Sequence, residues 1–135
     1  NIGMELKDTE GNLVMIDDSR LEPIFQYMSD NKINFTGHQG EPKNCWLPIE
    51  QMTVKQDRDY FVEHPEYHMF LLPEFPSYEE QIAARDNVLR KFPKLNYCGC
   101  HFASLEWSID EIAKRLDEFP SMMVDTAERI CHIQH

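Results

Sequence analysis

Two histidines, His38 and His101, are the residues best placed for chemistry, because each follows a segment with the pattern of a buried strand. The segments 33–37 and 95–100 share one plan, in which an apolar residue, Asn and an aromatic residue precede a Gly close to the His. In parallel α/β sheets, ligands and catalytic groups gather at the C-terminal ends of the strands. We therefore expect the two imidazoles to lie at one edge of a sheet.

The chemistry expected of two such imidazoles is the binding of one metal ion or one substrate, since neighbouring parallel strands lie about 4.8 Å apart. Neutral imidazole is the commonest ligand for Zn²⁺, and a catalytic zinc site keeps a position open for a water whose pKa falls to about 7. Two histidines do not complete such a site. Asp125, at the end of a third predicted strand, is either a further carboxylate partner or a helix cap.

The elements that must position these residues alternate along the chain. Capping boxes at Ser77–Glu80 and Ser108–Glu111 begin two helices, which Pro93 and Pro120 end. Further helices are predicted over residues 19–30 and 126–135, and the third strand over 122–124. The order helix, strand, helix, strand, helix, strand, helix requires a parallel sheet with right-handed crossovers.

Residues 39–76 form the least regular part of the sequence, with five prolines and many aromatic residues. We interpret them as a long βα loop with short helical turns near residues 48–52 and 58–63. A loop of this length is either a functional lid or an insertion that packs on itself. Both interpretations remain open from the sequence.

Composition narrows the class of protein. At 135 residues and 41% hydrophobic, the chain can bury the core of one domain or of part of one. A net charge of −11 without a Lys/Arg cluster argues against a nucleic-acid partner. No apolar run approaches the roughly 18 residues of a membrane span, so we expect a soluble protein with no membrane partner. Four cysteines without disulfide spacing favour reduced thiols and a cytoplasmic location.

Three strands are too few to bury both faces of a parallel sheet. The predicted fold class is therefore α/β, with parallel βα units that form part of a (β/α)₈ TIM-like barrel. Residues 1–135 would be a single partial barrel domain. We expect it either to self-associate or to be completed by the rest of the barrel.

Three segments, Gly37–Trp46, Tyr78–Asp86 and Gly99–Trp107, resemble the amidohydrolase-related family of metal-dependent hydrolases, a branch of the amidohydrolase superfamily. The resemblance implies a distorted (β/α)₈ barrel of which this chain is the portion from the fifth to the seventh strand. It implies that His38 is a metal ligand. It also implies that His101 is catalytic, either binding a second metal or polarising the substrate and moving protons.

The reaction implied by the resemblance is hydrolysis of an amide, ester or lactone carbonyl in a small-molecule substrate, with a divalent metal ion, Zn²⁺ first, activating the water. Some relatives carry out non-oxidative decarboxylation instead. Glu41, Trp46 and Glu106 are the candidate substrate-binding residues, each just beyond a strand or in the long loop. Each also has a structural interpretation, as a turn cap, a pin for the insertion and a solvated residue before a helix, respectively.

The sequence departs from the family pattern, because the first-strand His-x-His pair has no counterpart and the eighth-strand Asp would lie beyond His135. If only these residues exist, we expect weak metal binding and no turnover. One alternative is a non-catalytic fragment or interaction module that docks a partner through its acidic surface and aromatic loop. Another is a thiolate-using enzyme based on Cys98 or Cys100.

Overall fold

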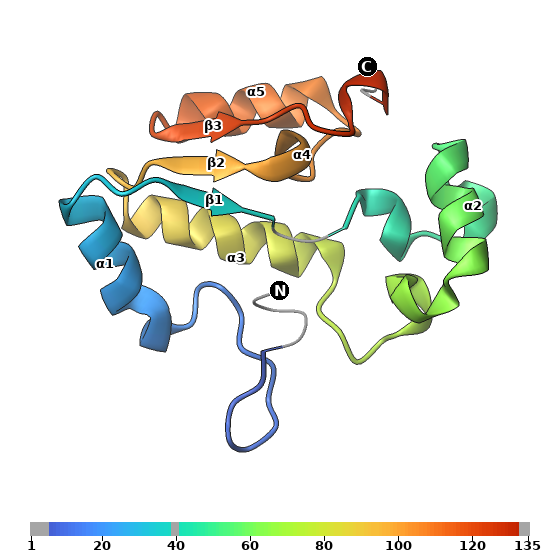
Figure 1. Cartoon of the computed structure of the whole chain (residues 1–135), viewed down its shortest axis with the longest axis horizontal. Helices are drawn as coiled ribbons and strands as arrows, with labels where there is room; N and C mark the ends of the chain where they lie inside the picture. Colours follow the sequence, from blue (N-terminus) through green and yellow to red (C-terminus); the bar gives the residue numbers. More distant parts are fainter. Residues whose placement is uncertain (1–5, 39–40, 133–135) are drawn as a thin grey trace.

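A three-stranded parallel sheet lies at the centre of the computed structural model, which describes residues 6–38 and 41–132 (Figure 1). The strands β1 (Phe35–Gly37), β2 (Tyr97–Gly99) and β3 (Met122–Val124) lie side by side in that order. Gly37 is in register with Gly99, and Gly99 with Val124. The predicted α/β class with parallel βα units is confirmed, although the first two strands are shorter than their sequence patterns suggested.

The helices begin where the cap residues predict. Ser77 and Glu80 form a reciprocal capping box at the start of α3 (Tyr78–Lys91). The Ser108 hydroxyl accepts a hydrogen bond from the Glu111 amide at the start of α5 (Ile109–Glu118). The predicted capping box is only half formed there, because the Glu111 carboxylate pairs with Arg115. The first helix, α1 (Glu22–Asp30), follows a 3-10 turn over Ser19–Leu21, which the Asp18 side chain caps.

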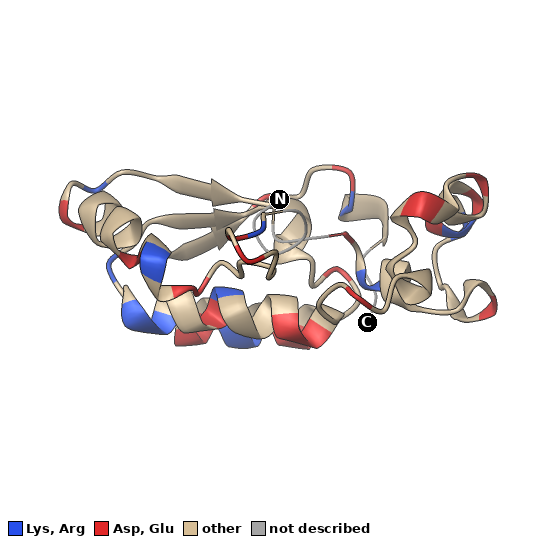
Figure 2. Cartoon of the chain, turned by 90° about the horizontal axis from the view of Figure 1, so that it is seen from below, with Lys and Arg blue, Asp and Glu red and all other residues tan. Residues whose placement is uncertain are grey.

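The sheet and the helices form two layers, which Figure 2 shows edge-on. Leu89 of α3 and Phe119 after α5 pack with Tyr97 and Met122 of the sheet in one buried cluster. Burying each such side chain contributes about 1.5 to 3 kcal/mol. The strands carry no charged residue, so the charges of Figure 2 lie on the helices and loops. On the opposite face of the sheet, Met123 is 53% exposed.

The long loop folds into a small unit with its own core, described here from residue 41 onward. It contains α2 (Lys55–Glu63) and four 3-10 turns: Lys43–Trp46, Ile49–Gln51, Pro65–Tyr67 and Met69–Leu71. Cys45, Met52, Phe61 and Met69 are buried together within it. Both predicted helical turns are present. The buried cluster shows that the loop packs on itself, which was one of its two interpretations. We call residues 41–76 the insertion.

The helix predicted over residues 126–135 is wrong for the part that the structure describes. That part contains only a 3-10 turn, Ile130–His132. Glu128 has a φ of 61°, a left-handed conformation that a right-handed helix cannot include. The rest of the predicted helix, residues 133–135, lies outside the described residues.

The described strands make an open sheet and not a closed barrel. β1 and β3 are its edge strands, and α3 and α5 cover the face that carries Tyr97 and Met122. Among the described residues, no helix has both the length and the apolar character needed to cross a membrane.

Candidate functional site at the C-terminal edge of the sheet

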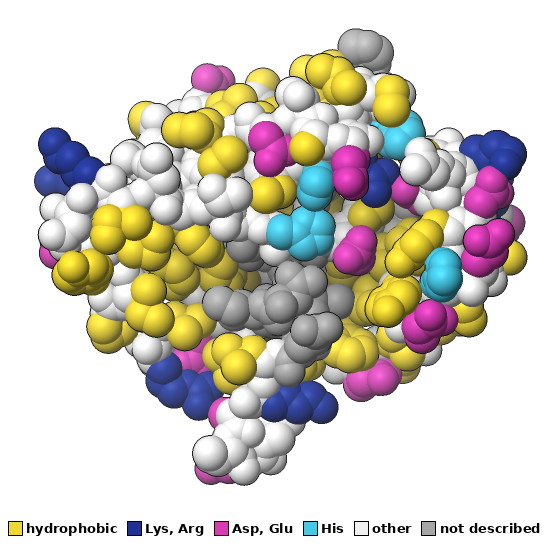
Figure 3. Space-filling model, in the orientation of Figure 1, with side chains coloured by type: hydrophobic (Ala, Val, Ile, Leu, Met, Phe, Trp, Pro, Cys, Tyr) yellow, Lys and Arg dark blue, Asp and Glu magenta, His cyan; other side chains and the backbone are white. Residues whose placement is uncertain are grey.

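The structure brings His38 and His101 together, as their positions after two strands predict. His38 directly follows β1, and His101 is the second residue after β2. Their ring centroids are 5.1 Å apart, with the ring planes at 83°. In the space-filling view of Figure 3, histidine side chains lie beside carboxylates near the middle of the molecule. The parallel alignment of β1 and β2 is what carries both imidazoles to one edge.

A left-handed turn follows β2 and sets the direction of His101. The turn begins within α4 (Cys100–Ala103), and the φ values of residues 101 to 104 are 55°, 56°, 56° and 58°. Left-handed helical conformation costs an L-residue roughly 1 to 2 kcal/mol. Four consecutive non-glycine residues therefore carry strain on the order of 4 to 8 kcal/mol, which contacts with other elements must offset.

Contacts with the segment after β3 offset part of that strain. The Asp125 carboxylate accepts a hydrogen bond from the His101 amide at 2.8 Å, and the Asp125 carbonyl accepts one from the Phe102 amide, also at 2.8 Å. The first of these bonds is the main cause that lowers the pKa of Asp125. Asp125 caps no following helix, although one of its two interpretations predicted such a cap, because that helix does not form in the described residues; its carboxylate accepts hydrogen bonds from the amides of His101 and Ala127.

The His101 ring has a defined tautomer in this arrangement. Its Nδ1 lies 2.8 Å from the Ala127 carbonyl oxygen, which can only accept a hydrogen bond. Nδ1 therefore carries the proton, and in the neutral ring Nε2 has the lone pair that can bind a ligand. A backbone carbonyl in this role is the usual support for a metal-binding or proton-transferring histidine.

Glu41 lies next to the pair. Its Oε1 is 3.8 Å from His38 Nε2, and both side chains are partly exposed. The contact with His38 lowers the pKa of Glu41, and the charges of Arg129 and His101 act in the same direction. Glu41 is therefore an ionised carboxylate at the edge that carries the histidines, as its prediction as a substrate-binding residue requires.

Glu106 and Trp46 are not arranged as surface contacts for a substrate. Glu106 is only 4% exposed, and its Oε2 has no hydrogen-bond partner among the described residues. Burial raises the pKa of Glu106. The Trp46 indole donates a hydrogen bond to the Pro76 carbonyl at 3.1 Å and packs edge-on against Tyr78, so it pins the insertion to the start of α3.

Sequence reasoning missed a buried ion pair close to the site. Arg129 Nη1 donates to Asp57 Oδ1 at 2.8 Å, and Asn44 donates to the other oxygen of Asp57 at 2.9 Å. The side chains of Arg129 and Asp57 are 14% and 6% exposed. The pair joins the segment after β3 to the insertion. Because its members are 72 residues apart and lie in charge-rich stretches that look solvated, nothing in the sequence signalled it.

Cys100 gives little support to a thiolate enzyme. Burial and the charge of Asp125 raise the pKa of Cys100, so its thiol stays protonated at neutral pH. Cys45 is fully buried in the insertion and donates to the Tyr67 carbonyl, and burial raises its pKa to about 12.

The spacing of the two imidazoles fits a shared zinc ion. With Zn–N bonds of about 2.1 Å and about 1.2 Å from nitrogen to ring centroid, two rings on one tetrahedral zinc have centroids about 5.4 Å apart, slightly more than the 5.1 Å between His38 and His101. Within residues 6–38 and 41–132, no three His, Cys, Asp or Glu side chains are grouped closely enough to hold a metal. Among the described residues, His38 and His101 would therefore be the two protein ligands, and they do not complete a metal site.

Comparisons with family models, with curated proteins and with solved structures found no match. The resemblance to amidohydrolase-related hydrolases therefore stays a prediction from the three sequence segments.

Proposed function

We propose that this chain forms part of the active site of a metal-dependent hydrolase of the amidohydrolase-related type. One observation carries the proposal: His38 and His101, from neighbouring parallel strands, meet with ring centroids 5.1 Å apart. The hydrogen bond from His101 Nδ1 to the Ala127 carbonyl places the lone pair of the neutral ring on Nε2, where it can bind a ligand.

In this proposal, His38 and His101 hold a divalent metal ion, with Zn²⁺ the expected metal. When bound, the ion supplies Lewis-acid polarisation of a carbonyl and an activated water at neutral pH. His101 also polarises the substrate or moves a proton through Nε2. Glu41 contacts a polar group of the substrate, because its ionised carboxylate lies 3.8 Å from His38. The substrate class is a small molecule with an amide, ester or lactone carbonyl, and the related decarboxylation of a small acid is the variant of this chemistry.

The proposal includes the barrel. A parallel sheet is normally covered on both faces, whereas here helices cover one face and Met123 is exposed on the other. Further strands beside β1 and β3 would bury that face and bring the missing ligands to the same edge. Self-association of the exposed edges is the outcome expected if those strands are absent. The four unpaired cysteines support a cytoplasmic location.

The test is zinc binding by the native full-length protein, measured by competition with a chromophoric chelator. His38→Ala and His101→Ala should each weaken binding by at least about tenfold, because each removes a ligand or its immediate support. His64→Ala is the matched control, since His64 is a partly exposed histidine of the insertion that contacts Glu66. Equal zinc affinity in all three variants would disprove the proposed site.

A second function, a non-catalytic interaction module, is favoured by exposed aromatic residues of the insertion. Tyr60, Tyr67 and Phe70 are 45%, 51% and 49% exposed, and the first two stack on each other. For such a module, the double variant His38→Ala/His101→Ala would keep partner binding, whereas Tyr60→Ala/Tyr67→Ala would lose it. The reverse result would favour the hydrolase.

A further inference from the structure

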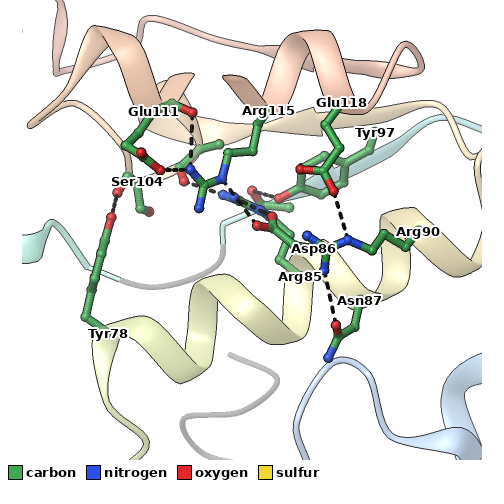
Figure 4. A network of polar contacts seen from close by, with 12 residues as sticks. Tyr78, Arg85, Asp86, Asn87, Arg90, Tyr97, Ser104, Glu111, Arg115 and Glu118 are labelled. Carbon is green, nitrogen blue, oxygen red and sulfur yellow. Dashed lines mark hydrogen bonds and ion pairs between the residues drawn. The ribbon is translucent and has the colours of Figure 1, made fainter. Parts of the chain in front are cut away.

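The left-handed turn after β2 is held from a second side, by helix α3. Arg85 Nη1 donates a hydrogen bond to the Ala103 carbonyl at 2.6 Å, and the Tyr78 hydroxyl donates one to the Ser104 carbonyl. Figure 4 shows the contact between Tyr78 and Ser104 and the polar network around Arg85. Two residues of one helix therefore bind two successive carbonyls of the strained turn.

Arg85 is buried to an unusual degree for a charged residue, with 1% of its side chain exposed. Its Nε and Nη2 donate to Asp86 Oδ1 at 3.0 and 2.7 Å, and Asp86 Oδ2 accepts from Arg115 of α5 at 3.2 Å. The planar guanidinium thus binds a carboxylate on one side and a main-chain carbonyl on the other.

A buried ion pair of this kind adds little stability over an apolar packing of the same volume. What it adds is orientation, because a guanidinium held by Asp86 accepts a carbonyl only along its remaining N–H direction and so fixes the direction of the Ala103 carbonyl. In the left-handed turn that carbonyl points at α3, whereas the two preceding amides point at Asp125. The turn is thus held between α3 and the segment after β3.

We propose that Arg85 and Tyr78 are positioning residues for His101. They hold residues 101–104 in the left-handed conformation and so keep the imidazole on the Ala127 carbonyl and beside His38. We call the hydrogen bonds from Arg85 and Tyr78 to the turn the clamp. Its role in catalysis rests on the function proposed above, but its role in orienting His101 does not. Without the two hydrogen bonds the turn relaxes toward right-handed dihedrals, and the His101 ring leaves its partner.

The direct readout is the tautomer of His101, measured by long-range ¹H–¹⁵N NMR of the native full-length protein at a pH where the ring is neutral. The wild-type ring should show a protonated Nδ1, because Ala127 accepts its proton. In Tyr78→Phe and Arg85→Met this preference should be lost in favour of the Nε2–H form that unconstrained histidines adopt. Zinc affinity should fall about tenfold in the same variants.

Arg90→Met is the matched control, since Arg90 lies on the same helix but pairs with the partly exposed Glu118. It should leave both the tautomer and the zinc affinity unchanged. Near-UV circular dichroism reports whether each variant folds. If Arg85→Met does not fold, Tyr78→Phe decides alone, because it keeps the ring and removes one hydroxyl, which also accepts a hydrogen bond from the Trp107 indole at 2.7 Å.

A folded Tyr78→Phe with the wild-type tautomer and zinc affinity would overturn the clamp. The clamp and the hydrolase also fail separately. A wild-type protein that binds no zinc, with a tautomer that still depends on Tyr78, would reject the proposed function and keep the positioning role. Zinc binding that is lost in His101→Ala but unchanged in the α3 variants would support the proposed function and reject the positioning role.

Discussion

Gly99→Ala tests whether the strained turn is packed as tightly as the structure requires. An added Cβ at Gly99 would lie 2.4 Å from Ala103 Cβ and 3.0 Å from Ala103 Cα, where carbon atoms normally lie about 3.5 to 4.0 Å apart. Neither atom belongs to a side chain that can rotate away, so the turn itself must move. Overpacking of this kind costs about 1 to 3 kcal/mol, and we expect a value near the upper end.

Urea denaturation with an unchanged m-value measures this loss, and a thermal scan should show a decrease in Tm of roughly 3 °C per kcal/mol for a chain of this size. Ala103→Gly is the companion variant, because it removes the Cβ that an alanine at position 99 would strike. In the double variant, the cost of Gly99→Ala should fall by at least about 1 kcal/mol. A Gly99→Ala protein within about 0.5 kcal/mol of wild type, or a double variant without recovery, would refute the reasoning about this contact.

Two further predictions concern buried charges. Burial raises the pKa of Glu106; a carboxyl that binds its proton more tightly in the folded state contributes stability at low pH that is lost as the pH rises through the folded pKa. Glu106→Gln should therefore gain stability relative to wild type as the pH rises above the usual range of a carboxyl group. The same pH dependence of the unfolding free energy in both proteins, measured by urea denaturation, would contradict this. Arg129→Met should destabilise by about 3 kcal/mol, because it leaves Asp57 buried without its cation. Arg20→Met, which removes an exposed partner of Asp18, should cost far less stability, and equal losses in the two variants would argue against the buried pair.

The parts of the fold that sequence reasoning predicted are those governed by local chemistry. Ser77 and Glu80 satisfy each other's backbone amides within one turn, so the start of α3 is readable from four residues. The alternation of helices and strands implied a parallel sheet, and the sheet brought His38 and His101 to one edge. The position of Glu41 beside the histidines was predicted from its place three residues after His38.

What the sequence by itself determined is therefore the order of the helices and strands as far as β3, and the two histidines that follow β1 and β2. The tertiary structure alone decided how His101 is aimed. Nothing in Cys100–Ser104 favours left-handed dihedrals, because all five residues carry a Cβ; contacts with Asp125, Arg85 and Tyr78, distant in sequence, offset the strain. The same holds for the burial of Glu106 and the pairing of Arg129 with Asp57, since a charged residue in a polar stretch reads as solvated until another part of the chain covers it.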